Sequence, residues 1–136
     1  MKDRFKFRYV FEKNFGGKTG VCYKIAIFDL NDVTDENFNK VIKGYIDFDY
    51  TIVSKDQCTG MKDKNSKLIY ENDIVYKKGS KNHKKEKMYS IVCWDGMYAQ
   101  FNISDKNGLH QMPSNPNNIE VIGNIYKSSE LLEESK

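Results

Sequence analysis

The sequence predicts a mainly β protein with one short helix near the N-terminus and a small, partly open β-barrel in the C-terminal part. Several runs of strand length alternate between apolar and polar residues, and about five of them follow one another within roughly 70 residues. Turn-forming Gly, Asn and Asp residues separate these runs. With 136 residues, 39% of them hydrophobic and 13% aromatic, the chain can build the core of one domain or two small ones.

The N-terminal segment predicts a β-hairpin. Aromatic side chains share one face of residues 4–11 and basic side chains share the other, which is typical of a half-buried strand. Glycines at positions 16, 17 and 20 permit a turn with positive φ, and the β-rich run 21–28 follows it. The aromatic face comprises Phe5, Phe7, Tyr9 and Phe11, and the basic face comprises Arg4, Lys6 and Arg8.

A short helix follows this hairpin. Thr34 is placed to cap it, Asp35 and Glu36 complement the positive end of its dipole, and we expect it to end near Lys43 because Gly44 follows. Residues 45–53 alternate again and predict a strand with one face exposed to solvent.

The rest of the chain predicts a meander of short strands. Turns are expected at residues 64–67, at 71–73 and at Asp95-Gly96. A strand is expected over 97–103, and the polar stretch 104–118 is expected to be a loop. A last strand over 119–126 and a short helix from Ser128 or Ser129 complete it. We therefore divide the chain into an N-terminal β region (1–53), a barrel (54–126) and a C-terminal helix or tail (127–136).

Three segments together resemble one protein family. They are FKFRYVF near the start, QCTGMKDKNSKLIYENDIV at 57–75 and IEVIGNIYKSSELL at 119–132. In order and spacing they are similar to the YopX family, whose members are encoded mainly by phages and prophages of Gram-positive bacteria. The resemblance implies an SH3-like barrel in the C-terminal domain and a more variable N-terminal β region, and it implies no reaction mechanism.

Two turns differ from the family pattern, which has Asn-Gly in the first and Glu-Gly-Asp in the second. Here the first turn contains Asn65-Ser66 and the second reads Glu71-Asn72-Asp73. Asn72 suits a positive φ, whereas Ser66 does so less well, which leaves the register of the first hairpin open. We assign structural roles at turns, in preference to metal binding or acid-base chemistry, to Gly60, Asp63, Asn65, Asn72, Asp73 and Gly123.

The basic excess of the chain is concentrated in residues 77–87. This segment holds six lysines and one glutamate, a charge of +5, so the other residues carry −2 of the total +3. Two interpretations fit a loop of this charge: it binds the phosphates of a nucleic acid, or it only increases the solubility of the protein. Trp94, Tyr98 and Phe101 either stack on the bases of a single-stranded nucleic acid or belong to the core. The candidate binding lysines are Lys77, Lys78, Lys81, Lys84, Lys85 and Lys87.

No residue pattern identifies a reaction, a cofactor or a metal site. The three cysteines form no CxxC pair, and we interpret them as reduced thiols rather than as a nucleophile paired with His83 or His110. No run approaches the roughly 18 apolar residues of a membrane span, and no secretory signal begins the chain. We expect a soluble protein of the host cytoplasm, without an enzymatic activity or a membrane partner.

Three functions remain open. The first is a non-enzymatic phage accessory protein that binds a host macromolecule, in one version a host defence enzyme that it inhibits. The second is nucleic-acid binding through the lysines of residues 77–87. The third is a pocket that sequesters a small molecule such as a nucleotide. Exposed barrel edges would also permit a homo-oligomer.

Overall fold

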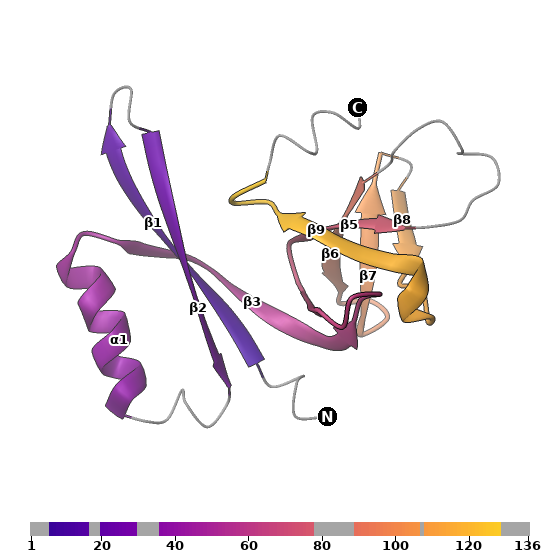
Figure 1. Cartoon of the computed structure of the whole chain (residues 1–136), viewed down its shortest axis with the longest axis horizontal. Coiled ribbons are helices and arrows are strands. Elements are labelled where there is room, and N and C mark those ends of the chain that lie inside the picture. The colour runs from indigo at the N-terminus through magenta and orange to yellow at the C-terminus, as the bar shows by residue number, and fades with distance from the viewer. Residues whose placement is uncertain (1–5, 17–19, 30–35, 78–88, 107, 129–136) are drawn as a thin grey trace. The chain divides into compact units, whose positions relative to one another are not determined.

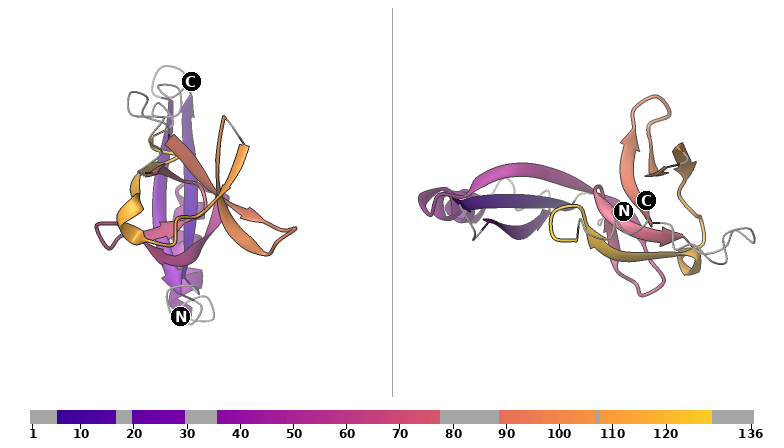
Figure 2. Two further views of the ribbon diagram at one scale, coloured as in Figure 1. Left: turned by 90° about the vertical axis from the view of Figure 1, so that its right-hand side faces the viewer. Right: turned by 90° about the horizontal axis from the view of Figure 1, so that it is seen from above.

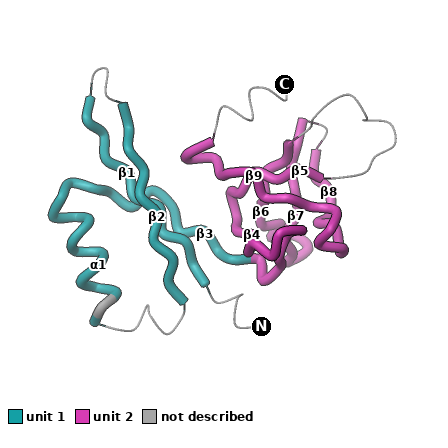
Figure 3. Tube along the Cα trace, viewed as in Figure 1, with its two compact units in different colours: residues 1–58 teal, residues 59–136 magenta. Residues whose placement is uncertain are grey.

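The computed structural model divides the chain into two compact units, Met1–Cys58 and Thr59–Lys136 (Figure 3). Its strands form one four-stranded and one five-stranded sheet, and the predicted mainly β fold class is confirmed. The division between the units falls inside a strand, a few residues beyond the boundary expected at 53/54. The structure describes residues 6–16, 20–29, 36–77, 89–106 and 108–128.

In the N-terminal unit, three antiparallel strands carry one α-helix (Figure 1). Strand β1 is the central strand, and it pairs with β2 along one edge and with β3 along the other. The last four residues of β3 belong to the C-terminal unit, and β3 pairs with β4 in the four-stranded sheet. The elements are β1 (Lys6–Gly16), β2 (Gly20–Asp29), α1 (Glu36–Asp47) and β3 (Thr51–Lys62).

The core of this unit is aromatic, as the alternation in residues 4–11 predicts. Tyr9 and Phe11 of β1 are buried with Phe28 of β2, and α1 covers them. The helix contributes one stripe of apolar side chains at intervals of four and three residues, so they lie on the same face. These are Phe38, Ile42 and Tyr45. Arg4 and Phe5 lie outside the described residues.

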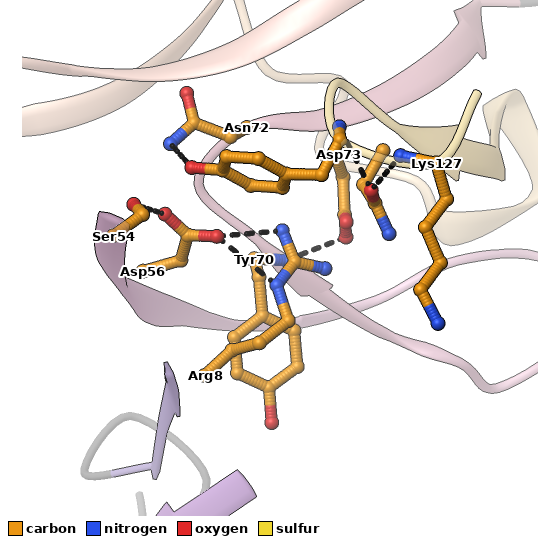
Figure 4. Close-up of polar contacts among 9 residues, drawn as sticks. Arg8, Ser54, Asp56, Tyr70, Asn72, Asp73 and Lys127 are labelled. Carbon is orange, nitrogen blue, oxygen red and sulfur yellow. Dashed lines mark hydrogen bonds and ion pairs between the residues drawn. The ribbon is translucent and has the colours of Figure 1, made fainter. Parts of the chain in front are cut away.

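Arg8, on the basic face of β1, is buried, whereas the prediction of a half-buried strand places this face toward solvent. Arg8 is only 6% exposed, and its Nε and Nη2 donate hydrogen bonds to Oδ2 of Asp56 at 3.1 and 3.0 Å (Figure 4). Ser54 Oγ donates to Oδ1 of the same carboxylate at 2.6 Å. Arg8 and Asp56 are cross-strand partners in the β1–β3 ladder, so this buried charge pair fixes the register of two strands that are distant in sequence.

Helix α1 is longer than predicted, because Gly44 does not end it. The helix runs on to Asp47, so residues 45–47 are helical and the following strand begins at Thr51. Asp49 has φ 66°, and the N–H groups of Tyr50 and Asp49 donate to the carbonyls of Tyr45 and Ile46 at 3.0 Å each. These two bonds form a Schellman motif, in which the left-handed residue is Asp49 instead of the usual glycine.

In the C-terminal unit, a five-stranded antiparallel sheet has the order β8-β7-β6-β5-β9 and curls into part of a barrel (Figure 2). Its core contains Ile69 of β4 together with side chains from β5, β6, β7 and β9. The elements are β4 (Leu68–Tyr70), β5 (Asp73–Lys77), β6 (Tyr89–Asp95), β7 (Gln100–Asp105), β8 (Gly108–Gln111), a 3-10 turn η4 (Pro116–Asn118) and β9 (Ile119–Asn124). The core residues are Ile69, Val75, Val92, Ile103, Ile119 and Val121.

Two expectations for this unit are wrong. Strand β8 lies within the stretch that the sequence predicts to be a loop. The prediction misses it because β8 is an edge strand with an exposed Leu109, so its sequence shows no alternation of apolar and polar residues. Strand β7 begins at Gln100, since Met97 and Tyr98 belong to the turn that precedes it. The expected C-terminal helix falls almost entirely on residues 129–136, outside the described part of the chain.

Candidate interaction surface on the β6–β7 turn

The β6–β7 hairpin extends the core face of the C-terminal unit to an exposed turn. Val92 and Ile103 are cross-strand partners and both are fully buried. Two residues further along each strand, Trp94 and Phe101 are also partners, and the period of two places them on the same face. One face of this hairpin therefore changes from core to surface as the strands approach the turn.

Trp94 is held in place by Phe101. Their ring centroids lie 4.9 Å apart with an interplanar angle of 69°, which is the favourable edge-to-face geometry. Phe101 itself packs against the buried core, whereas Trp94 remains 46% exposed. Beyond it, Met97 is 85% exposed and Tyr98 is 70% exposed. We call Trp94, Met97 and Tyr98 the aromatic turn.

The backbone of the aromatic turn is fixed by Asp95. Its Oδ1 accepts hydrogen bonds from the N–H groups of Met97 and Tyr98 at 3.0 and 3.4 Å, and its Oδ2 accepts one from Asn102 Nδ2 at 2.9 Å. Ala99 completes the turn in the left-handed region, with φ 51°. Three large side chains are thus presented by a turn whose conformation is set before any partner binds.

The charge of this hairpin distinguishes between possible partners. Residues 88–105 contain no lysine or arginine, and they contain two aspartates, Asp95 and Asp105. Phosphate groups are attracted by cationic side chains and repelled by carboxylates. Exposed Trp, Tyr and Met side chains are instead enriched in the centres of protein–protein interfaces. The chemistry of the aromatic turn therefore matches a protein surface better than a nucleic acid.

The predicted basic segment falls mostly outside the described residues. Lys77 is the last residue of β5 and is exposed. The other five candidate lysines, Lys78, Lys81, Lys84, Lys85 and Lys87, and also His83, lie in the part of the chain that the structure does not describe.

Asp63 organises the turn after β3. Its Oδ1 accepts hydrogen bonds from the backbone N–H groups of Asn65 and Lys67, each at 2.9 Å, and its Oδ2 accepts one from Val121 at 2.9 Å. Burial alone would raise the pKa of Asp63, but the three N–H donors and the charge of Lys67 lower this pKa below its ordinary value. Ser66 has φ 64°, so this turn keeps the left-handed residue that the family pattern assigns to glycine.

The β4–β5 turn has a similar construction. Asn72 has φ 66° and its N–H donates to the carbonyl of Val92 at 2.8 Å, while its side-chain amide donates to the hydroxyl of Tyr126 at 3.3 Å. The carboxylate of Asp73 accepts from the N–H of Tyr70 at 2.8 Å (Figure 4). These polar side chains bind backbone or neighbouring groups and thereby shape the turn.

The two remaining turn glycines lie within strands. Gly60 in β3 has φ 80°, a conformation that other residues rarely adopt. Gly123 pairs with Ile74 at the point where the β5–β9 register shifts, and it is therefore part of a bulge. Each glycine thus lies at an irregular point of its strand.

The thiols and the histidine of the described chain show no arrangement for nucleophilic or metal chemistry. None of the three cysteines forms a disulfide; Cys58 is buried, and Cys22 and Cys93 are half-buried. Burial raises the pKa of Cys93, and the charges of Asp95 and Glu71 raise it further, which keeps the thiol protonated at neutral pH. His110 contacts Asp105 with a distance of 3.1 Å between Nε2 and Oδ1. Within the described ranges, no group of three His, Cys, Asp or Glu residues is placed to hold a metal ion.

The sequence singled out three aromatic residues of this hairpin and missed a fourth apolar one. Of the three, Phe101 packs against the core, which is one of the two interpretations that the sequence left open. Trp94 and Tyr98 are exposed. Met97 was assigned to a strand and is instead the most exposed member of the aromatic turn. Its position directly after Asp95-Gly96 was the available signal, since a turn begins there.

Fold and surface together define a two-unit β protein that presents an aromatic turn. The chain belongs to the YopX family, whose model matches residues 6–133. A crystal structure of protein EF1440 from Enterococcus faecalis is similar to it, with 22% sequence identity and a TM-score of 0.42 over 89% of this chain and 74% of that one. No curated protein matches the sequence. None of the described helices is long and apolar enough to cross a membrane.

Proposed function

We propose that this chain is a phage accessory protein that binds a host protein through the aromatic turn. The observation that carries the proposal is the exposure of Trp94, Met97 and Tyr98 on a turn that Asp95 holds in one conformation. Rigid aromatic side chains lose little conformational entropy on binding, which makes them effective anchors. The family resemblance supports the phage origin and the host cytoplasm as the place of action.

Binding, rather than catalysis, fits the polar side chains of the C-terminal unit. Asp63 uses both carboxylate oxygens to accept backbone N–H groups, so they are engaged in holding the turn. The raised pKa of Cys93 makes its thiol a weak nucleophile. A component of a host defence system, inhibited by occupation of its surface, is the version of the partner that we favour.

The test is to recover the tagged chain from a bacterial host and then to reproduce the interaction with both purified proteins. The double variant Trp94→Ala, Tyr98→Ala should weaken the purified complex by at least tenfold, since each anchor contributes about 1 to 2 kcal/mol or more. Leu109→Ala is the matched control, because this residue is 59% exposed and lies on another strand. An affinity that the double variant leaves unchanged would exclude the aromatic turn as the interface.

Nucleic-acid binding through residues 77–87 is the competing function, and it rests on the +5 charge of that segment. It requires a complex with DNA or RNA that weakens steeply with salt and is lost when Lys81, Lys84, Lys85 and Lys87 are replaced by Gln. Such a result, combined with no effect of Trp94→Ala, Tyr98→Ala, would replace the protein-binding proposal.

A further inference from the structure

The N-terminal unit contains a hollow of about 490 Å³ that is separate from the aromatic turn. It lies between β2, α1 and the segment that leads from α1 into β3. Three aromatic residues and two lysines are among the residues that line it. The residues that decide its chemistry are Lys24, Lys40, Gly44, Tyr45, Phe48 and Tyr50.

The aromatic wall of the hollow is fixed by packing. Tyr45 stacks on the buried ring of Phe11, with centroids 4.0 Å apart and an interplanar angle of 11°. Tyr50 meets Tyr45 edge to face at 5.5 Å and 85°. The Schellman motif at the end of α1 holds the backbone of Tyr45 and Tyr50 together through the bond between them. A ring that enters the hollow therefore meets preorganised aromatic surfaces.

Gly44 keeps the hollow open. It lies inside α1, where glycine costs about 1 kcal/mol relative to alanine. A Cβ atom placed on it would meet nothing within 4 Å, so packing within the described chain does not require glycine here. A larger side chain at this position would project into space that the hollow now occupies. Phe48, which also lines the hollow, is 71% exposed, so a ligand can reach its ring.

The two charged residues that line this hollow are both lysines. Lys24 comes from β2 and Lys40 from α1, and among the described residues neither ammonium group has a carboxylate partner. A third lysine is close, since Lys13 Nζ lies 5.6 Å from the centre of the Tyr50 ring. Desolvation and the neighbouring Cys22 thiol raise the pKa of Tyr50, so its hydroxyl stays protonated and adds no negative charge.

We propose that this hollow binds a small molecule that combines a planar aromatic ring with an anionic group, the chemistry of a nucleoside monophosphate. The ring would stack against Tyr45, Tyr50 and Phe48, and the anion would pair with Lys24 and Lys40. Neither element alone suffices, because an exposed ion pair contributes only about 0 to 1 kcal/mol. The hollow is open to solvent on one side, so we expect an affinity in the range of about 0.1 to 1 mM.

The experiment uses the full chain with AMP as the probe, followed by backbone chemical shifts and by the thermal midpoint. AMP should shift the resonances of α1 and β2 in a saturable way and raise the midpoint, because a ligand that binds only the folded state stabilises it. Adenosine carries only the aromatic ring and inorganic phosphate only the anionic group, so each should bind at least tenfold more weakly than AMP. Equal binding of adenosine and AMP, or no saturable shift at about 10 mM AMP, would overturn the proposal.

Variants at the hollow separate binding from folding. Gly44→Leu should weaken AMP binding at least tenfold while it leaves the fold as stable or more stable, because leucine is the better helix former. Lys24→Gln and Lys40→Gln should each weaken binding severalfold, and Lys43→Gln is the control on the same helix, away from the hollow. Unchanged affinity in Gly44→Leu would overturn the proposal.

A second copy of the chain is the alternative occupant of the hollow, and the Gly44→Leu variant also tests it. If the chain self-associates in sedimentation experiments and Gly44→Leu abolishes this, the hollow binds a second copy of the chain and the small-molecule proposal is wrong.

The double variant Trp94→Ala, Tyr98→Ala should leave AMP binding unchanged, because these residues belong to the other unit. The proposal for the aromatic turn and the proposal for the hollow can therefore fail independently.

Discussion

Asp63 and Val121, which are 58 residues apart in sequence, are joined by a hydrogen bond of 2.9 Å from the backbone N–H of Val121 to the Asp63 carboxylate. The same turn makes a second connection to this region, because the N–H of Lys64 donates to the carbonyl of Ile119 at 3.0 Å. The first turn of the C-terminal unit is thus tied to its last strand. Two of the segments that carry the family resemblance meet at this carboxylate.

The first prediction concerns the pH dependence of stability. Because the pKa of Asp63 is lowered in the folded state, its carboxylate stabilises the fold above the unfolded pKa of about 4, and this contribution is lost as the pH falls through the folded pKa. Asp63→Asn should reduce the free energy of unfolding by about 2 kcal/mol at pH 7 and flatten its decrease in acid. Denaturant unfolding at pH 7 and between pH 5 and about 2 measures both effects. Asp47→Asn, at an exposed position at the end of α1, is the control, and by removing a negative charge there it should raise the free energy of unfolding by no more than about 1 kcal/mol.

The second prediction concerns the buried pair Arg8 and Asp56. Replacing either residue alone, as Arg8→Met or Asp56→Leu, leaves one charge buried and should cost about 3 to 5 kcal/mol. The double variant should cost clearly less than the sum of the two, since an apolar pair leaves no uncompensated charge. Thermal unfolding of the four proteins measures this coupling. Additive effects would show that the two charges do not depend on one another for stability.

The third prediction tests the end of α1. Asp49 adopts φ 66°, which is strained for a residue with a Cβ, and its carboxylate lies at the negative end of the helix dipole. Asp49→Gly should therefore raise the free energy of unfolding by about 1 kcal/mol and the thermal midpoint by about 4 °C. Asp49→Ala removes the carboxylate but keeps the Cβ, and it should gain less. A loss of stability in Asp49→Gly would mean that the Asp49 side chain makes a favourable contact.

The sequence was sufficient to predict elements whose faces differ in polarity. The aromatic face of β1 and the turns around Asp63 and Asn72 could be placed because alternation and turn chemistry are local signals. The length of α1 could not, since Gly44 is an ordinary stop signal and the real stop is a left-handed aspartate. The alternation in residues 4–11 places Arg8 on the basic face of a half-buried strand, and no local signal indicates that this residue is buried with a partner 48 residues away.

The two candidate sites also differ in how far they can be predicted from local sequence signals. The aromatic turn is local: its residues lie within one hairpin, so the sequence singled out Trp94 and Tyr98, although not their role. The hollow in the N-terminal unit is assembled from β2, α1 and the start of the path into β3, and its residues are spread over positions 24 to 50. No spacing rule connects these segments, because their proximity depends on how α1 lies on the sheet.

The fourth prediction concerns the thiol of Cys93. Its pKa is raised by burial first and then by the charges of Asp95 and Glu71, so little thiolate is present at neutral pH. Iodoacetamide should therefore alkylate Cys93 more slowly at pH 7 than it alkylates a free cysteine, and the rate should rise with pH beyond the point where free cysteine levels off. Mass spectrometry of digested samples measures this rate site by site. Faster alkylation than free cysteine at pH 7 would contradict it and would reopen a nucleophilic role.

The last prediction uses Trp94 as a reporter of the aromatic turn, because it is the single tryptophan of the chain. Acrylamide should quench its fluorescence readily, since the side chain is 46% exposed, and a bound partner should protect it. Asp95→Ala removes the acceptor for the N–H groups of Met97 and Tyr98. The same change removes the acceptor of the Asn102 amide, which is only 5% exposed, so we expect stability to fall by about 1 to 3 kcal/mol.

Partner affinity should fall further than stability in Asp95→Ala, because a turn that samples several conformations must be ordered again on binding. Asp95→Asn keeps one side-chain oxygen as an acceptor and should lie between the wild type and Asp95→Ala in both measurements. The comparison separates the two roles of Asp95: equal losses of affinity and stability would indicate a structural residue only, whereas an affinity loss that exceeds the stability loss is the result expected for a preorganised binding turn.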